Sequence, residues 1–160
     1  MKFAPTVFLL FALACPAASD SETTELDFEK HPELITFDCV RTWHAQGGLK
    51  EHSAPRARYL DLNGDGREEV FLGLAGAGRF MTYALFTKTS RGWILLSDKI
   101  IGSIASFEIL PSRHDEWHDF MTVVPTWRGR GYWRFTYTWN GKRYVDKTLR
   151  ETRDDELSHE

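Results

Sequence analysis

The chain has few cysteines and no strong excess of charge of either sign. Two cysteines, Cys15 and Cys39, occur among 160 residues. Cys15 lies in an N-terminal segment with a targeting pattern, so we expect no disulfide within the folded domain. The formal net charge of −3 provides no electrostatic basis for binding nucleic acid or an anionic membrane.

Familiar catalytic motifs are also lacking. The sequence contains no G-x-S-x-G and no phosphate-binding glycine motif. His114 and His118 are four residues apart in "RHDEWHD", but residues so spaced on a strand lie about 13 Å apart, so we interpret this segment as a solvated turn. Cys39 has only His44 as a nearby base, and we interpret it as a small buried hydrophobic residue. A binding or structural protein is therefore favoured over an enzyme.

Residues 1–19 have the pattern of a secretory signal. Lys2 precedes a short apolar run, Val7–Ala14, which is followed by small residues. Two processing routes remain open. Cleavage after Ser19 would release a soluble protein, whereas "ALAC" resembles a bacterial lipobox and would place a lipid on Cys15. Both routes predict export across the inner membrane, either to the periplasm or to a lipid anchor in the envelope.

The remaining chain divides by composition into three parts. Residues 20–32 are acidic and polar, which predicts a flexible lead-in. Residues 33–149 predict a single β-rich domain, and residues 150–160 predict a charged, frayed tail. The first element of the domain, Glu33–Trp43, is predicted to be a strand or a short helix.

The domain is dense in strand signals. Asn140-Gly141 predicts a hairpin with a type I′ turn, and "TSRG" predicts another hairpin. In "YWRFTYTW" apolar and polar side chains alternate, so one face of this strand is wholly aromatic. That face consists of Trp133, Phe135, Tyr137 and Trp139.

The sequence also contains a loose internal repeat. A shift of about fifty residues aligns two units of similar pattern. Glu69–Phe71 then falls on Asp119–Met121, and Leu85 falls on Phe135. We therefore expect a mainly β fold in which two β-meander units pack together.

The stretch "DLNGDGREEV" has the spacing of a metal-binding loop. Asp61, Asn63 and Asp65 alternate and are followed by Gly66, and calcium takes six to eight oxygen ligands from such groups. An EF-hand needs a glutamate at position twelve in a helix, but Leu72 occupies that position in an expected strand. The alternative interpretation is an ordinary Asn/Gly/Asp turn between strands.

The pattern D-x-N-x-D-G-x-x-E resembles the calcium loops of FG-GAP repeats, as in integrin α-subunit propellers and bacterial VCBS-type repeats. The resemblance implies one structural calcium ion. Its ligands would be the side chains of Asp61, Asn63, Asp65 and Glu69 and the carbonyl of Arg67. The family usually has aspartate at the ninth position, where this chain has glutamate. Two blade-like units are too few to close a propeller, so their sheets must pack together.

A second loop, "TWRGRGYW", has the composition of a recognition surface, with Trp127, Arg128, Arg130 and Tyr132 as candidate partner-binding residues. We therefore predict a non-catalytic envelope binding protein with a structural calcium loop. It would inhibit or neutralise a partner protein, or bind an envelope polysaccharide. The alternatives are a metal-dependent hydrolase of the envelope and a purely structural envelope lipoprotein.

Overall fold

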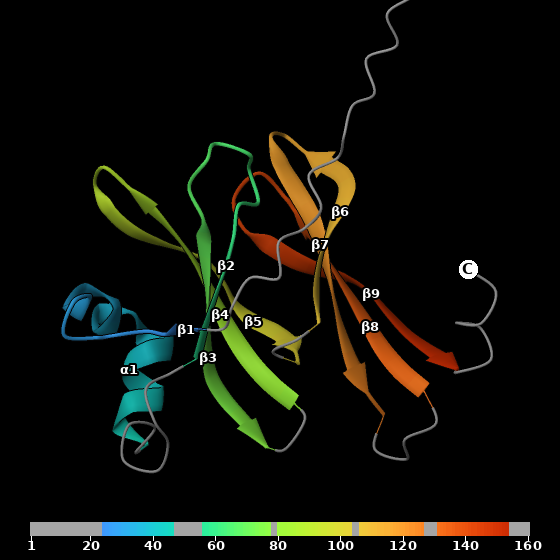
Figure 1. Cartoon of the computed structure of the whole chain (residues 1–160), viewed down its shortest axis with the longest axis horizontal. Helices are drawn as coiled ribbons and strands as arrows, with labels where there is room; N and C mark the ends of the chain where they lie inside the picture. The colour runs from blue at the N-terminus through green and yellow to red at the C-terminus, as the bar shows by residue number, and fades with distance from the viewer. Residues whose placement is uncertain (1–23, 47–55, 78–79, 104–105, 127–130, 154–160) are drawn as a thin grey trace, which may run out of the picture.

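The computed structural model describes residues 24–46, 56–77, 80–103, 106–126 and 131–153. It shows two antiparallel sheets, with a helical layer against one of them (Figure 1). The first sheet contains β1 (Thr24–Glu25), β2 (Arg56–Leu60), β3 (Glu69–Ala77), β4 (Phe80–Thr89) and β5 (Gly92–Gly102). The second contains β6 (Phe107–His114), β7 (Trp117–Pro125), β8 (Gly131–Trp139) and β9 (Tyr144–Arg153). The helical layer consists of η1 (Pro32–Thr36) and α1 (Asp38–Ala45).

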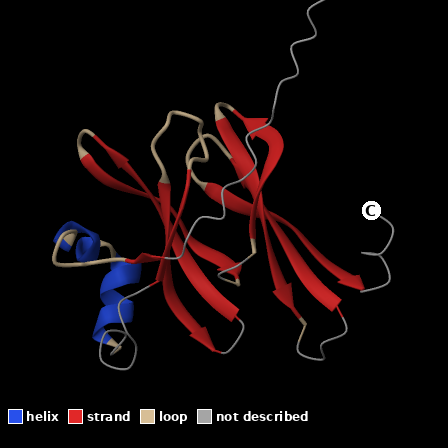
Figure 2. Cartoon of the chain, in the orientation of Figure 1, coloured by secondary structure: helices blue, strands red, loops and turns tan. Residues whose placement is uncertain are grey.

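Each sheet is a meander of four consecutive strands. The spatial order is β2-β3-β4-β5 in the first sheet and β6-β7-β8-β9 in the second, and all neighbours are antiparallel. The short strand β1 adds to the free edge of β2. Figure 2 shows the two sheets side by side, with the helices on one side only. The prediction of a mainly β fold built from two packed meander units is confirmed.

The main core lies between the two sheets and is largely aromatic. Phe71 of β3 and Phe120 of β7 are both fully buried, and their rings meet edge to face at 5.1 Å between centroids. Phe107 lies 4.6 Å from Phe71, and Tyr137 stacks on Phe120 at 5.0 Å. Edge-to-face and stacked rings of this kind stabilise a packed core beyond their buried area.

The predicted aromatic face of β8 is part of this core. Phe135 and Tyr137 are buried there, and Trp133 and Trp139 pack against the same cluster. The alternation read from "YWRFTYTW" is therefore confirmed, because alternate residues of a strand point to opposite sides.

The outer face of the first sheet is covered by the helical layer, and here the expected strand or helix over Glu33–Trp43 is helical. Leu34, Phe37, Val40 and Trp43 recur every three residues and all contact the second apolar cluster. Spacing of three to four residues places side chains on one face of a helix, whereas a strand would need a spacing of two. In that layer Phe37 meets Phe86 of β4 at 5.0 Å between ring centroids.

The second sheet also satisfies polar groups at the edge of the first. The amide of Ile101 in the edge strand β5 donates to the Tyr137 hydroxyl at 2.8 Å, and the Thr122 hydroxyl donates to the Ile101 carbonyl. Unpaired backbone groups at a sheet edge are costly when they are buried. These contacts explain why Thr122 is buried, and burial raises the pKa of Tyr137 to about 12, which keeps the phenol neutral.

The boundaries of the folded domain differ from those expected at both ends. Within the predicted lead-in, Leu26 is buried and Phe28 packs against the same cluster, so that part of the segment belongs to the fold. At the other end β9 continues to Arg153, past the expected boundary at residue 149. Apolar spacing is weak in both segments, and their placement depends on strand pairing with distant residues.

The two predicted hairpins are present. The turn between β4 and β5 is formed by Ser90 and Arg91. In the turn after β8, Gly141 has a φ of +86° but the φ of Asn140 is not positive. A type I′ turn needs a positive φ at both residues, so the predicted geometry is wrong. Instead the Asn140 side chain accepts hydrogen bonds from the amides of Lys142 and Arg143, which makes a longer Asx-type turn.

Among the residues that the structure describes, no helix has the length and apolar character needed to cross a membrane.

Candidate functional site: the acidic loop and its surroundings

The acidic loop connects β2 to β3 and is organised by its own side chains. Both oxygens of Asp61 accept backbone hydrogen bonds, from the amide of Gly64 at 2.7 Å and from that of Gly66 at 3.0 Å. Asn63 and Asp65 each accept from the amide two residues further on. Gly64 and Gly66 have φ values of +73° and +80°, a conformation that glycine adopts without strain.

Leu62 connects this loop to both sheets. Its side chain is fully buried in the core between them. Its amide donates to Glu69 of β3 at 2.7 Å, and its carbonyl accepts from the amide of His118 in β7 at 2.7 Å. The loop is therefore a connection between the two sheets as well as a turn between two strands.

Glu69 is a buried carboxylate at the base of this connection. Its side chain has 1% of its surface exposed, and it accepts hydrogen bonds from Leu62 and from the Thr87 hydroxyl. Burial raises the pKa of Glu69 to about 7, although the two hydrogen bonds lower it and the charges of Asp61 and Asp65 raise it further. Desolvation penalises the charged form and is the dominant cause.

The second unit has a buried carboxylate at the equivalent position. Asp119 has 3% of its surface exposed and accepts from the Ser112 hydroxyl at 2.7 Å. In both units the carboxylate accepts a hydrogen bond from the residue seven positions earlier. The donor is the backbone amide of Leu62 in the first unit and the side-chain hydroxyl of Ser112 in the second. The sequence alignment of Glu69 with Asp119 thus corresponds to a shared position in the two meanders.

A tyrosine of the second sheet lies near both carboxylates. Tyr144 donates its hydroxyl hydrogen to the His118 carbonyl at 2.7 Å. Burial raises the pKa of Tyr144 most, and the charges of Glu69 and Asp119 raise it further. The carboxylates of Glu69 and Asp119 therefore both act on Tyr144, although they belong to different units.

The predicted calcium ligands lie close along the chain, and the side chains of the loop are hydrogen-bonded to its own backbone. The loop itself contains Asp61, Asn63 and Asp65, whereas Glu69 is the first residue of β3. Among the described residues, no group of three His, Cys, Asp or Glu side chains is arranged to hold a metal ion. Each loop side chain gives at least one oxygen to a backbone amide, and a carboxylate oxygen retains a second lone pair. The donor chemistry fits calcium, and the loop has the glycine conformations that wrapping an ion requires.

The two histidines of "RHDEWHD" flank a tight hairpin turn between β6 and β7. Asp115 in this turn has a φ of +48°. His114 is held through Nδ1 by Asp119 at 2.9 Å, and His118 through Nδ1 by the Leu110 carbonyl at 2.8 Å. The interpretation as a turn holds, but both imidazoles are oriented by the scaffold, which the sequence did not reveal.

Several predicted site residues lie outside the described part of the chain. They are Cys15, Trp127, Arg128 and Arg130. Tyr132 is described. It lies in β8 opposite Pro125 of β7, is half-buried, and points away from the aromatic core. Cys39 packs in the helical layer but is half-buried rather than buried as predicted, and partial burial raises the pKa of its thiol.

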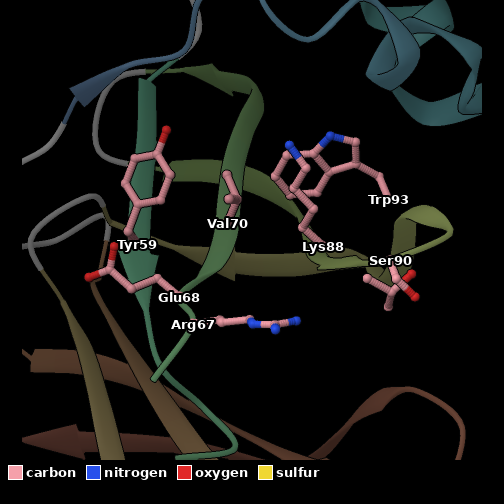
Figure 3. Close-up of a pocket in the computed structure, with 8 residues that line it drawn as sticks. Tyr59, Arg67, Glu68, Val70, Lys88, Ser90 and Trp93 are labelled. Atoms are coloured by element: carbon pink, nitrogen blue, oxygen red, sulfur yellow. The ribbon is translucent and has the colours of Figure 1, made fainter. Parts of the chain in front are cut away.

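A pocket on the outer face of the first sheet was not predicted. It has a volume of about 500 Å³ and lies between β2, β3 and the β4–β5 hairpin (Figure 3). Its lining residues are Tyr59, Arg67, Glu68, Val70, Lys88, Thr89, Ser90 and Trp93. Arg67 and Glu68 are the last residues of the acidic loop, so that loop forms part of the wall. The sequence offers no shared motif for these positions, because only strand pairing brings them together.

Comparisons with models of protein families, with curated proteins and with solved structures found no match.

Proposed function

We propose that this protein is a non-catalytic binding protein of the bacterial envelope, with a structural calcium ion in its acidic loop. One observation carries the proposal: the carboxylates suited to chemistry are committed to the scaffold. Glu69 is held by Leu62 and Thr87, and Asp119 by Ser112 and His114. Such satisfied buried groups stabilise a particular arrangement of sheets, and a rigid arrangement suits recognition.

The envelope location rests on the N-terminal segment. Export through the predicted signal places the protein in the periplasm or, if Cys15 carries lipid, at a membrane surface. Metabolic labelling with palmitate distinguishes the two: incorporation that is lost in Cys15→Ala indicates the anchor, and no incorporation indicates the soluble form.

The binding role has a direct test. The exported protein, immobilised and incubated with solubilised envelope material, is expected to retain a component at fixed stoichiometry and to release it chemically unchanged. Release of cleaved glycan or peptide that increases with time would contradict the proposal. The unchanged ligand is the expected result because the two buried carboxylates, Glu69 and Asp119, are held by hydrogen bonds within the scaffold.

One observation favours an alternative, hydrolysis. His114 is bound through Nδ1 to the buried Asp119, so its other ring nitrogen is oriented as in a general base. If time-dependent cleavage is found, a loss of that activity in His114→Ala with retained thermal stability would assign it to this pair.

Calcium is expected to stabilise the protein. A loop of this type in extracellular modules binds calcium with a Kd of about 10⁻⁴ to 10⁻³ M. At 10 mM calcium, mass action then predicts about 1.4–2.7 kcal/mol of added stability. Thermal unfolding with calcium and with chelator measures this.

The matched control is magnesium at the same concentration, which prefers tighter octahedral geometry. Asp61→Asn and Asp65→Asn are expected to remove most of the calcium effect. An identical melting temperature in calcium and in chelator, together with no heat in a calorimetric titration, would show that the loop is an ordinary turn.

A further inference from the structure

We infer that the pocket between Tyr59 and Trp93 binds an acidic sugar residue of an envelope glycan through its carboxylate. The inference rests on the proposed binding role and assigns that role a site and a ligand class. Its lining does not include Tyr132, the described residue of the recognition loop predicted from sequence. Its volume of about 500 Å³ lies within the usual range of small-molecule sites, about 300–1,000 Å³.

The Trp93 wall is already fixed in place. Its indole N–H donates to Glu33 at 2.7 Å, and the His31 ring meets it edge to face at 5.7 Å. Lys88 places its ammonium group 5.4 Å from the centre of the indole ring. Three contacts from two parts of the chain thus hold this side chain, so a ligand would not need to order it.

The charged groups of the pocket lining favour a monoanion. Arg67 and Lys88 are exposed, and neither takes part in an ion pair among the described residues. Among the described lining residues Glu68 has the one carboxylate, so the lining itself has a net charge of +1, while Glu33, which accepts the Trp93 hydrogen bond outside the lining, offsets part of the Lys88 charge. A single carboxylate complements that charge, whereas a phosphate dianion would leave excess negative charge.

The arrangement of these groups also suits a sugar ring. Figure 3 shows Tyr59 on one side, Lys88 and Trp93 on the other, and Val70 between them. Arg67 extends toward Ser90, while Glu68 extends toward Tyr59. A pyranose with its apolar face on Tyr59 would present its carboxylate to the cations and its hydroxyls to Glu68 and Ser90.

The position of the pocket favours a glycan over a peptide strand as the ligand. It opens on the face of the first sheet, where β2, β3 and β4 have backbone partners on their shared edges. A peptide that adds to a sheet needs an unpaired edge. Recognition here must therefore use side chains, and the exposed rim at Arg67, Glu68 and Lys88 allows a longer chain to extend beyond the pocket.

The test is a calorimetric titration of tetragalacturonate into the exported protein at a fixed calcium concentration, with the heat of the same titration into protein-free buffer subtracted because uronates themselves bind calcium. Binding is expected, and Arg67→Gln and Lys88→Gln should each weaken it about tenfold, as lost charged hydrogen bonds do. Lys99→Gln, an exposed lysine of β5 outside the pocket, is the matched control and should bind as the wild type does. Melting temperatures verify that all three variants are folded.

The methyl-esterified tetramer separates charge recognition from stacking, because it keeps the shape and loses the carboxylates. It is expected to bind at least tenfold more weakly. Equal binding of acid and ester, unchanged binding by Arg67→Gln and Lys88→Gln, or no binding by the wild type would each overturn the inference. The proposed function fails separately, if envelope material shows no retained component or shows cleavage.

Discussion

Leu62→Ala is expected to lower the free energy of unfolding by about 2–5 kcal/mol. The side chain is fully buried between the two sheets, and the backbone of the same residue bonds to Glu69 and His118. Truncation leaves a cavity at the point where the loop joins the sheets, and a rigid scaffold can only partly collapse around it. Because most domains are stable by about 5–15 kcal/mol, this loss would be a large share of the total.

Chemical denaturation with a two-state fit measures the effect. The matched control is Ile94→Ala, which also shortens an aliphatic side chain but at a position with 47% of its surface exposed. It should change stability by no more than about 0.5 kcal/mol. Equal small effects of the two substitutions would show that Leu62 belongs to a peripheral turn rather than to the core.

Glu69 is expected to make the calcium-free protein less stable as the pH rises. Its folded pKa of about 7 lies above the ordinary glutamate value of 4.5. The folded state therefore holds more protons than the unfolded state between pH 4.5 and 7, and stability falls with rising pH through that window. The full effect is about 3 kcal/mol at pH 8, taking about 1.4 kcal/mol for each pKa unit.

The measurement is denaturation with chelator at pH 4.5 and at pH 8, for the wild type and for Glu69→Gln. The glutamine cannot ionise but keeps an acceptor for the Leu62 amide, so its stability relative to the wild type should increase by about 3 kcal/mol from the lower to the higher pH. Glu68→Gln, an exposed neighbour, is the control and should show no such change. A parallel pH dependence of Glu69→Gln and the wild type would mean that Glu69 is ionised without penalty in the folded state.

Local patterns predicted the strands well because the two sheets follow the chain order. The alternation in β8 identified its buried aromatic face. The internal repeat aligned Glu69 with Asp119, the buried carboxylates of the two units. The segment Glu33–Trp43 was harder, since its β-forming residues and its three-residue apolar spacing point to different elements. Packing against the first sheet settles that conflict in favour of helices, an example of tertiary context overriding local propensity.

The contacts that matter most for function could not be read from the chain. Leu62 and His118 are distant in sequence, and no motif marks a backbone hydrogen bond between them. The same holds for Tyr59 and Trp93, which share a pocket only because β2, β3 and β4 pair in register. By contrast, the loop glycines and acidic residues were recognisable, because a tight turn requires those residue types at that spacing.

The connection of the two sheets through the acidic loop is the central claim, and native-state hydrogen exchange tests it most directly. The amides of Leu62 and His118 are expected to exchange as slowly as that of Phe71 in the central strand β3, since all three should open only on global unfolding. The exposed loop amide of Gly66 should exchange much faster. Exchange of Leu62 and His118 at the rate of Gly66, with Phe71 still protected, would contradict the account and reduce the loop to a surface turn.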